Sequence, residues 1–259
     1  MSLHLLADPS LLAGLPAAHL LPMAPLVPMT PLDDAGNGGF GIEINGPDGT
    51  PSAAITTLVG IALLAVAPAL LLMMTSFTKI FVVLALVRNA LGLNTIPPNQ
   101  VIAGLSLFLT FFIMWPVIGD INTAAVVPYL DGQTTFSVAA EHAAEPLRNW
   151  LLAYTREEDI ALMVRAAGLD NPATPADVQL TTLVPAFMVS ELRAAFIIGF
   201  VVFVPFLVID LVVSSALMAM GMMMLPPVMV SLPFKILLFI LVDGWGLVVT
   251  ALISSYRGG

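Results

Sequence analysis

The chain has 259 residues, of which 59% are hydrophobic and only 10% are charged, and its mean hydropathy is +1.00. A soluble domain typically carries about 25% charged residues, so this composition predicts an integral membrane protein and excludes a large soluble catalytic domain. The formal net charge is −9. Nucleic acid is not an expected partner, because binding phosphates requires a concentrated basic surface.

Residues 1–51 are predicted to form a tail rich in proline and glycine, followed by a linker. This region contains acidic residues but no Lys or Arg, and prolines interrupt its leucine-rich stretch. A secretory signal has a basic start and an unbroken apolar core of about 7 to 15 residues, so a flexible tail is favoured over a cleaved signal region. The Gly, Asp, Asn and Pro residues of 33–51 favour turns and predict the linker.

Residues 52–119 are predicted to form a first apolar helical hairpin. A helix needs roughly 20 apolar residues to cross the hydrocarbon core, and 53–74 and 100–119 are both uncharged over about that length. Lys79 and Arg88 lie between these two spans. At about 100° per residue they fall on opposite faces of one helix, so no single orientation hides both from lipid, and both need partners or water.

Residues 120–181 are predicted to form an acidic helical insert. Leu147, Trp150, Leu151 and Tyr154 recur at the spacing of an amphipathic helix. Thr155 and Glu158 have the spacing of a capping box, which predicts the start of a second short helix.

The basic residues give the expected orientation of the chain. Lys79 and Arg88 follow the first span, whereas no basic residue precedes it. The positive-inside rule therefore places the connection 75–99 in the cytoplasm and the acidic insert 120–181 on the extracytoplasmic side.

Residues 182–259 are predicted to form a C-terminal helical hairpin with a methionine-rich turn. The stretch 182–220 is too long for one simple span, so we expect a long or broken helix with Gly199 and Pro205 as weak points. The sequence GMMMLPP at 221–227 predicts the turn, and 228–254 predicts a last single helix.

Five ionisable residues lie within this apolar half of the chain. They are Glu191, Arg193, Asp210, Lys235 and Asp243. A lone charge that faces lipid costs several kcal/mol, so we expect these side chains to face other helices or an aqueous path. Structural ion pairing is favoured over a proton or ion relay. Asp210 and Lys235 are the preferred pair because they lie in the two arms of the hairpin.

Methionines gather around the predicted turn, at Met218, Met220, Met222, Met223, Met224 and Met229. Methionine is unbranched and flexible, and it fills irregular gaps. Loose apolar packing is the simpler interpretation. Alternatively, a ring of such side chains from several subunits could close against ions and still deform around a passing chain.

No pattern in the chain indicates catalysis. The HExxH, GxSxG and P-loop motifs are absent, and His4, His19 and His142 lie outside the apolar spans. With no cysteine, thiolate metal sites are excluded as well. We therefore expect no enzymatic activity, no cofactor and no metal site.

Six segments together resemble the FliP/SctR family of type III secretion export-gate subunits. They are MTSFTKIFVVLALVRNALGL at 74–93, PPNQVIAGLSLFLTFFIMWPV at 97–117, PLRNWLLAYTREEDIALM at 146–163, PAFMVSELRAAFIIGF at 185–200, VPFLVIDLVVSSALMAMGMMMLPP at 204–227 and SLPFKILLFILVDGW at 231–245. The segments cover most of residues 70–256 in the order that the family has.

The resemblance implies an all-α membrane protein whose hairpins assemble into an oligomeric export-gate cone, partly above the bilayer. It implies a homo-oligomer with FliQ-like and FliR-like subunits, working beside FlhA/FlhB-like export components in the bacterial inner membrane, at the flagellar basal body. The implied cargo is unfolded rod, hook and filament proteins. The family's methionine gasket maps onto Met222, Met223 and Met224.

The flagellar branch is favoured over the virulence branch by PPNQ at 97–100, LTFF at 109–112 and the long N-terminal extension. An export-gate subunit of a virulence type III secretion system is the alternative. A small-molecule or ion transporter, with the buried charges as coupling sites, and a basal-body scaffold without a pore are further alternatives.

Overall fold

The computed structural model describes residues 53–93, 95–170, 172–222 and 224–256, and every regular element in these ranges is helical. The longer helices are α1 (Ala53–Met73), α2 (Phe77–Ala90), α3 (Asn99–Ile121), α5 (Phe136–Tyr154), α7 (Leu180–Ala219) and α8 (Pro227–Leu241). The shorter elements are a π-helical turn at Asn122–Val126, α4 (Val127–Leu130), α6 (Glu157–Ala166), a 3₁₀ turn at Pro175–Asp177 and α9 (Gly244–Ser254). The predicted all-α class is confirmed. The predicted tail at 1–51 lies outside the described residues.

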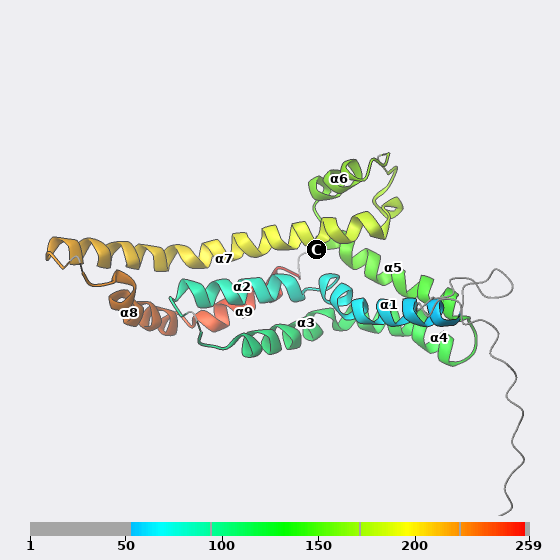
Figure 1. Cartoon of the computed structure of the whole chain (residues 1–259), viewed down its shortest axis with the longest axis horizontal. Coiled ribbons are helices and arrows are strands. Elements are labelled where there is room, and N and C mark those ends of the chain that lie inside the picture. The colour runs from blue at the N-terminus through cyan, green and yellow to red at the C-terminus, as the bar shows by residue number, and fades with distance from the viewer. Residues whose placement is uncertain (1–52, 94, 171, 223, 257–259) are drawn as a thin grey trace, which may run out of the picture. The chain divides into compact units, whose positions relative to one another are not determined.

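Helix α7 packs against helices from both halves of the chain. It contacts α2, α5, α6 and α8, and Figure 1 shows it as the long yellow to orange helix. Its 40 residues form one continuous helix through Pro185 and Pro205, so of the two predicted forms, long or broken, the long one is correct. At 1.5 Å per residue it is about 60 Å long, about twice the thickness of a hydrocarbon core.

Helix α2 lies in the centre of the first hydrophobic core. Its residues Ile80, Val83, Leu84 and Val87 follow the helical spacing i, i+3, i+4 and i+7, and all four are fully or almost fully buried. Residues of α3, α7, α8 and α9 complete this core. The helix is therefore held on several sides, which fixes Lys79 one position before the buried stripe.

A second hydrophobic core joins the insert to the long helices. Trp150 and Leu151 of α5 are buried there with residues of α3 and α7, while Leu147 and Tyr154 pack against them. The amphipathic stripe predicted over these four positions is confirmed. The insert is thus attached to α3 and α7 through apolar contacts as well as through polar ones.

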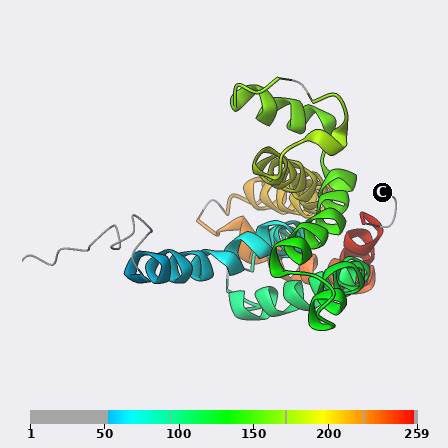
Figure 2. The same ribbon diagram turned by 90° about the vertical axis from the view of Figure 1, so that its right-hand side faces the viewer.

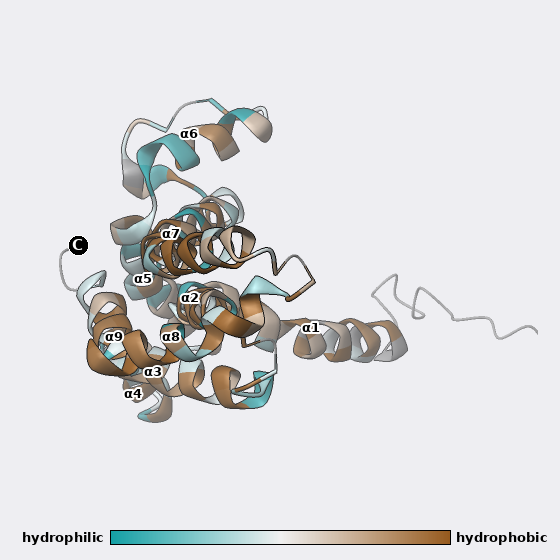
Figure 3. Ribbon diagram, turned by 90° about the vertical axis from the view of Figure 1, so that its left-hand side faces the viewer, coloured by the Kyte–Doolittle hydropathy of each residue, from teal (hydrophilic) through white to brown (hydrophobic). Residues whose placement is uncertain are grey.

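Among the described residues, two helices are long and apolar enough to cross a membrane, and up to four spans result if each bent helix pair counts as one. The two are Asn99–Leu130, in which α3 continues through the π turn into α4, and α7. The bent pairs are α1 with α2, at 65°, and α8 with α9, at 61°. Figure 3 shows how much of these helices is hydrophobic. The insert predicted from residue 120 therefore begins, in the structure, as a continuation of helix α3.

The prediction of one helix over 228–254 is wrong, because the chain bends between α8 and α9. Asp243 adopts a left-handed conformation with φ of 50°, which a helix interior does not allow. A side chain at Gly244 would overlap the ring of Phe239. The glycine thus permits the close approach at the bend, where the sequence reads as a continuous apolar run.

The predicted capping box before α6 is also wrong. The Thr155 hydroxyl donates to the carbonyl oxygen of Leu151 at 2.6 Å rather than accepting from the new helix, and Arg156 occupies the cap position. Glu158 instead lies 3.4 Å from Arg193 of α7. The hydroxyl therefore caps the end of α5, and the acidic side chain attaches α6 to α7.

Packing of α2 against α7 depends on the missing side chain of Gly199. A Cβ there would lie 3.1 Å from the Cβ of Leu86 and would overlap one of its methyl groups. We expect Gly199→Ala to destabilise the protein by about 1–3 kcal/mol, as overpacking does. Gly104→Ala is the matched control, because nothing lies within 4 Å of its new methyl group. Thermal unfolding in detergent measures both variants, and equal midpoints would contradict this packing.

Candidate functional site

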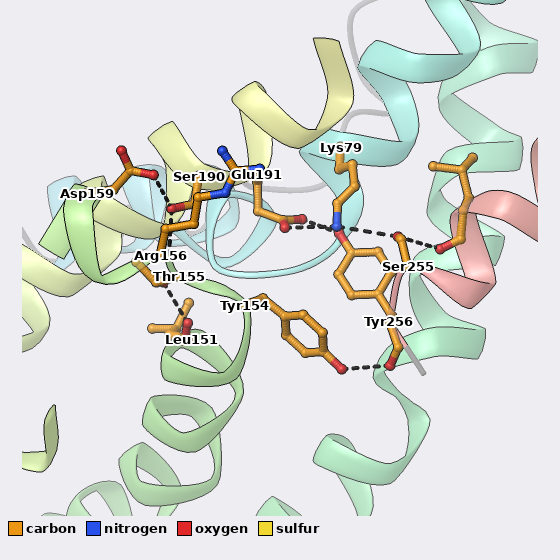
Figure 4. A network of polar contacts seen from close by, with 11 residues as sticks. Lys79, Leu151, Tyr154, Thr155, Arg156, Asp159, Ser190, Glu191, Ser255 and Tyr256 are labelled. Atoms are coloured by element: carbon orange, nitrogen blue, oxygen red, sulfur yellow. Dashed lines mark hydrogen bonds and ion pairs between the residues drawn. The ribbon is translucent and has the colours of Figure 1, made fainter. Parts of the chain in front are cut away.

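A buried ion pair joins α2 to α7. The amine of Lys79 lies 3.0 Å from Oε1 of Glu191, and both side chains are at least 96% buried. The same amine donates to the hydroxyl of Ser255 at 3.4 Å and lies 3.7 Å from the ring centroid of Tyr256. Figure 4 shows this arrangement. The sequence predicts that Lys79 needs a partner or water, and its partner is the carboxylate of Glu191, 112 positions later in the chain.

Two tyrosines extend this network to α5. The Tyr256 hydroxyl donates to Oε2 of Glu191, and the Tyr154 hydroxyl donates to the carbonyl oxygen of Tyr256 at 2.6 Å. Burial, with the nearby Glu191 carboxylate, raises the pKa of Tyr256 well above its usual value and raises the pKa of Tyr154. Both phenols therefore remain neutral donors at physiological pH. Trp150 stacks on Tyr256 with ring centroids 5.4 Å apart.

A second polar group attaches α6 to α7. The carboxylate of Asp159 is buried, accepts a hydrogen bond from the Ser190 hydroxyl at 2.6 Å, and lies 3.4 Å from the guanidinium of Arg193. Arg193 also lies 3.4 Å from Glu158, and this contact is largely exposed. Exposed pairs of this kind contribute about 0–1 kcal/mol, so the buried Ser190–Asp159 hydrogen bond is the stronger attachment.

A third polar group lies inside the α7–α8 hairpin. The amine of Lys235 is 2.6 Å from Oδ2 of Asp210, and the Ser231 hydroxyl donates to Oδ1 of the same carboxylate at 2.5 Å. Lys235 also donates to the carbonyl oxygen of Ala90, at the end of α2, at 3.3 Å. The two arms of the hairpin are therefore joined to each other and to α2 by one buried amine.

The five ionisable residues selected from the sequence do not form one cluster. Glu191 and Arg193 lie close in sequence but bind different partners, and Asp210 and Lys235 bind each other. Asp243 is exposed at the bend between α8 and α9, and within the described residues its side chain has no hydrogen bond or ion pair.

Some members of these networks carry no signal in the sequence. Asp159 and Ser190 are ordinary residues of a polar insert and an apolar helix, and Tyr256 follows the last predicted helix. Lys79, Glu191, Asp210 and Lys235 are detectable, because a charge within an apolar stretch requires a partner. The pairing of Lys79 with Glu191 depends on the packing of α2 against α7, which no local pattern encodes.

The methionine-rich turn connects α7 to α8, and its described side chains are left uncovered by the other described residues. Met222 is 43% exposed and Met224 is 97% exposed, whereas Met223 lies outside the described residues. Met218, Met220 and Met229 are 63% to 69% exposed. Gly221, with φ of +73°, ends the long helix. The turn thus presents flexible apolar side chains to whatever surrounds it.

Within the described residues, no group of three or more His, Asp or Glu side chains is arranged to hold a metal ion. The polar groups instead form pairs and networks between helices. The arrangement suits attachment of one helix to another.

Residues 60–252 match the model of the FliP family. The chain belongs to this family. Proteins named flagellar biosynthetic protein FliP are similar to it over most of its length. The protein of Bacillus subtilis is 51% identical over 79% of this chain and 93% of its own length. That of Pectobacterium carotovorum is 53% identical over 78% and 79%, and that of Aquifex aeolicus is 43% identical over 83% and 91%.

The FliP match covers nearly all of the helices that form the site. Lys79, Glu191, Asp210, Lys235 and the methionine turn all lie inside residues 60–252. Ser255 and Tyr256, which close the Lys79–Glu191 network, lie just beyond the matched range.

The buried Lys79–Glu191 pair predicts a specific pattern of stabilities. Removal of one partner leaves an uncompensated buried charge, so we expect Lys79→Met and Glu191→Gln each to destabilise the protein by about 3–5 kcal/mol. The double variant removes both charges and should lose less than the sum of the single variants. Thermal unfolding of the purified variants measures this coupling. Strictly additive losses would contradict the pair.

Proposed function

We propose that this chain is a pore-forming subunit of the flagellar type III protein export gate, in the bacterial inner membrane at the flagellar basal body. Its cargo would be unfolded rod, hook and filament proteins. Membership of the FliP family, and relatives named flagellar biosynthetic protein FliP, support the flagellar part of this proposal. Those relatives favour the flagellar branch over a virulence secretion system.

The main support for a pore is the exposure of the described methionines in the turn between α7 and α8. This turn ends a hairpin whose arms are joined by an ion pair. Met224 is 97% exposed, which is unfavourable for an apolar side chain in water. Several copies of the turn, brought together around one axis, would cover one another and form the gasket of Met222, Met223 and Met224. Flexible thioether side chains can seal such a ring and still yield to a passing chain.

The apolar faces of the hairpin support an oligomer. On α7, Phe196, Phe200 and Leu211 are 58% to 66% exposed, and on α8, Leu237 and Ile240 are 56% and 68% exposed. Surfaces of this kind require lipid or other apolar helices as neighbours. A homo-oligomer that also contains FliQ-like and FliR-like subunits, beside FlhA/FlhB-like components, would provide those helices.

The polar networks have a mechanical role in this proposal. The Asp210–Lys235 pair, with Ser231 and the carbonyl oxygen of Ala90, holds the hairpin arms together a few turns from the methionines. A pore that opens around a chain needs arms that keep their spacing while the turn deforms. Charges buried between helices of the same subunit provide that spacing without any catalytic step.

Replacement of the three gasket methionines tests the seal. We expect Met222→Ala, Met223→Ala and Met224→Ala, combined, to make cells leak small ions while export continues, because alanine is too short to close the ring. Membrane conductance and secreted flagellin are measured together. Met73→Ala, at an exposed methionine of α1, is the control. Unchanged conductance in cells that assemble the triple variant would contradict the gasket.

Cross-linking tests whether cargo passes the turn. We expect a cysteine placed by Met224→Cys to form an adduct with an export substrate stalled during transit, because the side chain would line the path. Leu162→Cys, at a half-exposed position of α6, serves as the control and should give none. The absence of an adduct at residue 224 would favour a scaffold without a pore.

A further inference from the structure

An open cavity of about 330 Å³ lies where α2, α7 and the turn between α5 and α6 meet. Its wall contains Lys79, Tyr154, Thr155, Arg156, Ser190 and Glu191. Most of these side chains are polar, whereas the other large cavities of the described chain are lined almost entirely by apolar side chains. The cavity is therefore suited to a polar ligand.

The hydroxyl groups and the amine of this cavity already have acceptors. The Tyr154 hydroxyl donates to the Tyr256 carbonyl, the Thr155 hydroxyl to the Leu151 carbonyl, and the Ser190 hydroxyl to Asp159. Lys79 is directed to Glu191 and Ser255. A ligand therefore has to be bound by a different donor.

Arg156 is that donor. Its backbone N–H donates to the Ser190 hydroxyl at 3.0 Å, which holds the residue at the cavity wall. Arg156 is half-buried, and its guanidinium makes no hydrogen bond or ion pair with the described residues. A guanidinium stays charged and carries five N–H donors. Among the residues that line the cavity, Lys79 and Glu191 neutralise each other, and the nearby carboxylates of Glu158 and Asp159 are directed to Arg193. The guanidinium of Arg156 is thus the lining charge that has no partner among the described residues, which favours an anion.

The cavity lies at a boundary between polar and apolar parts of the chain. Helix α6, which follows Arg156 and has three acidic residues in its first turn, is partly hydrophilic, whereas α7 is largely hydrophobic beyond the cavity, as Figure 3 shows. Figure 2 shows the helices of the insert and the long helices from the end. Trp150, Tyr154 and Tyr256 cluster beside the cavity. Aromatic residues of this kind are typical of the membrane interface.

We propose that this cavity binds the phosphate group of a membrane phospholipid through the guanidinium of Arg156. A guanidinium fits phosphate oxygens with two parallel hydrogen bonds, and basic cavities between membrane helices bind lipid head groups. The acyl chains would then lie along the apolar surface of α7, which exposes Ile197 and Val201 in the following turns, on the same helix face as Ser190 and Ala194. This inference does not depend on the proposed pore.

Binding of defined lipids to the purified full-length chain tests the proposal. Phosphatidylglycerol is titrated into detergent micelles that contain the protein, and the shift of the unfolding midpoint gives the apparent affinity. We expect Arg156→Gln to weaken binding by about tenfold or more, because charge-assisted hydrogen bonds are lost. Arg165→Gln, at an exposed arginine of the same insert, should bind like the wild type. Diacylglycerol, which lacks the phosphate, should not distinguish the variants.

Several results would overturn the proposal. These are equal binding of phosphatidylglycerol by Arg156→Gln and the wild type, or saturation of the site by inorganic phosphate alone with no added affinity from the lipid. A wild-type oligomer that carries no lipid and falls apart on Arg156→Glu would instead identify an acidic side chain of a neighbouring subunit as the ligand. If Arg156→Gln does not fold, Arg156→Lys is compared with Arg165→Lys, and equal affinities of these two overturn the proposal as well.

Discussion

An ionised side chain buried between apolar helices has to meet an opposite charge, and this constraint organises the structure. Lys79 and Glu191 bring α2 and α7 into one register, and Asp210 and Lys235 do the same for α7 and α8. Each pair is surrounded by further hydrogen bonds, which buried charges need if they are to be tolerated. The apolar cores then pack around helices whose relative positions the charges have specified.

The same constraint separates the rigid part of the molecule from its exposed end. Both hydrophobic cores lie along α2, α3, α5, α9 and α7 as far as Ile209, with Phe239 of α8. In the described chain, the hairpin nearer the turn between α7 and α8 is joined by the Asp210–Lys235 pair together with Ser231. Beyond that pair, apolar side chains are exposed. A subunit built in this way offers a firmly held body and an adaptable tip, which suits the proposed ring around a translocating chain.

The sequence predicts the helical class, the long helix of the hairpin and the need of Lys79 for a partner, because hydropathy and charge act locally. It does not predict the bend at Asp243, where a left-handed residue and the contact between Gly244 and Phe239 depend on tertiary packing. It misassigns Thr155, since the hydroxyl can cap either of two adjacent helices. The Tyr256–Glu191 contact joins residues 65 positions apart, which no local spacing indicates. Family resemblance, rather than periodicity, suggests a role for the methionines.

The measurement that tests the central claim most directly is the amount of flagellin and hook protein in the culture medium of a strain that lacks this chain, with and without the chain supplied in trans. The account predicts that both proteins disappear from the medium on deletion and return on complementation. Normal secretion of both by the deletion strain would contradict a role in flagellar export.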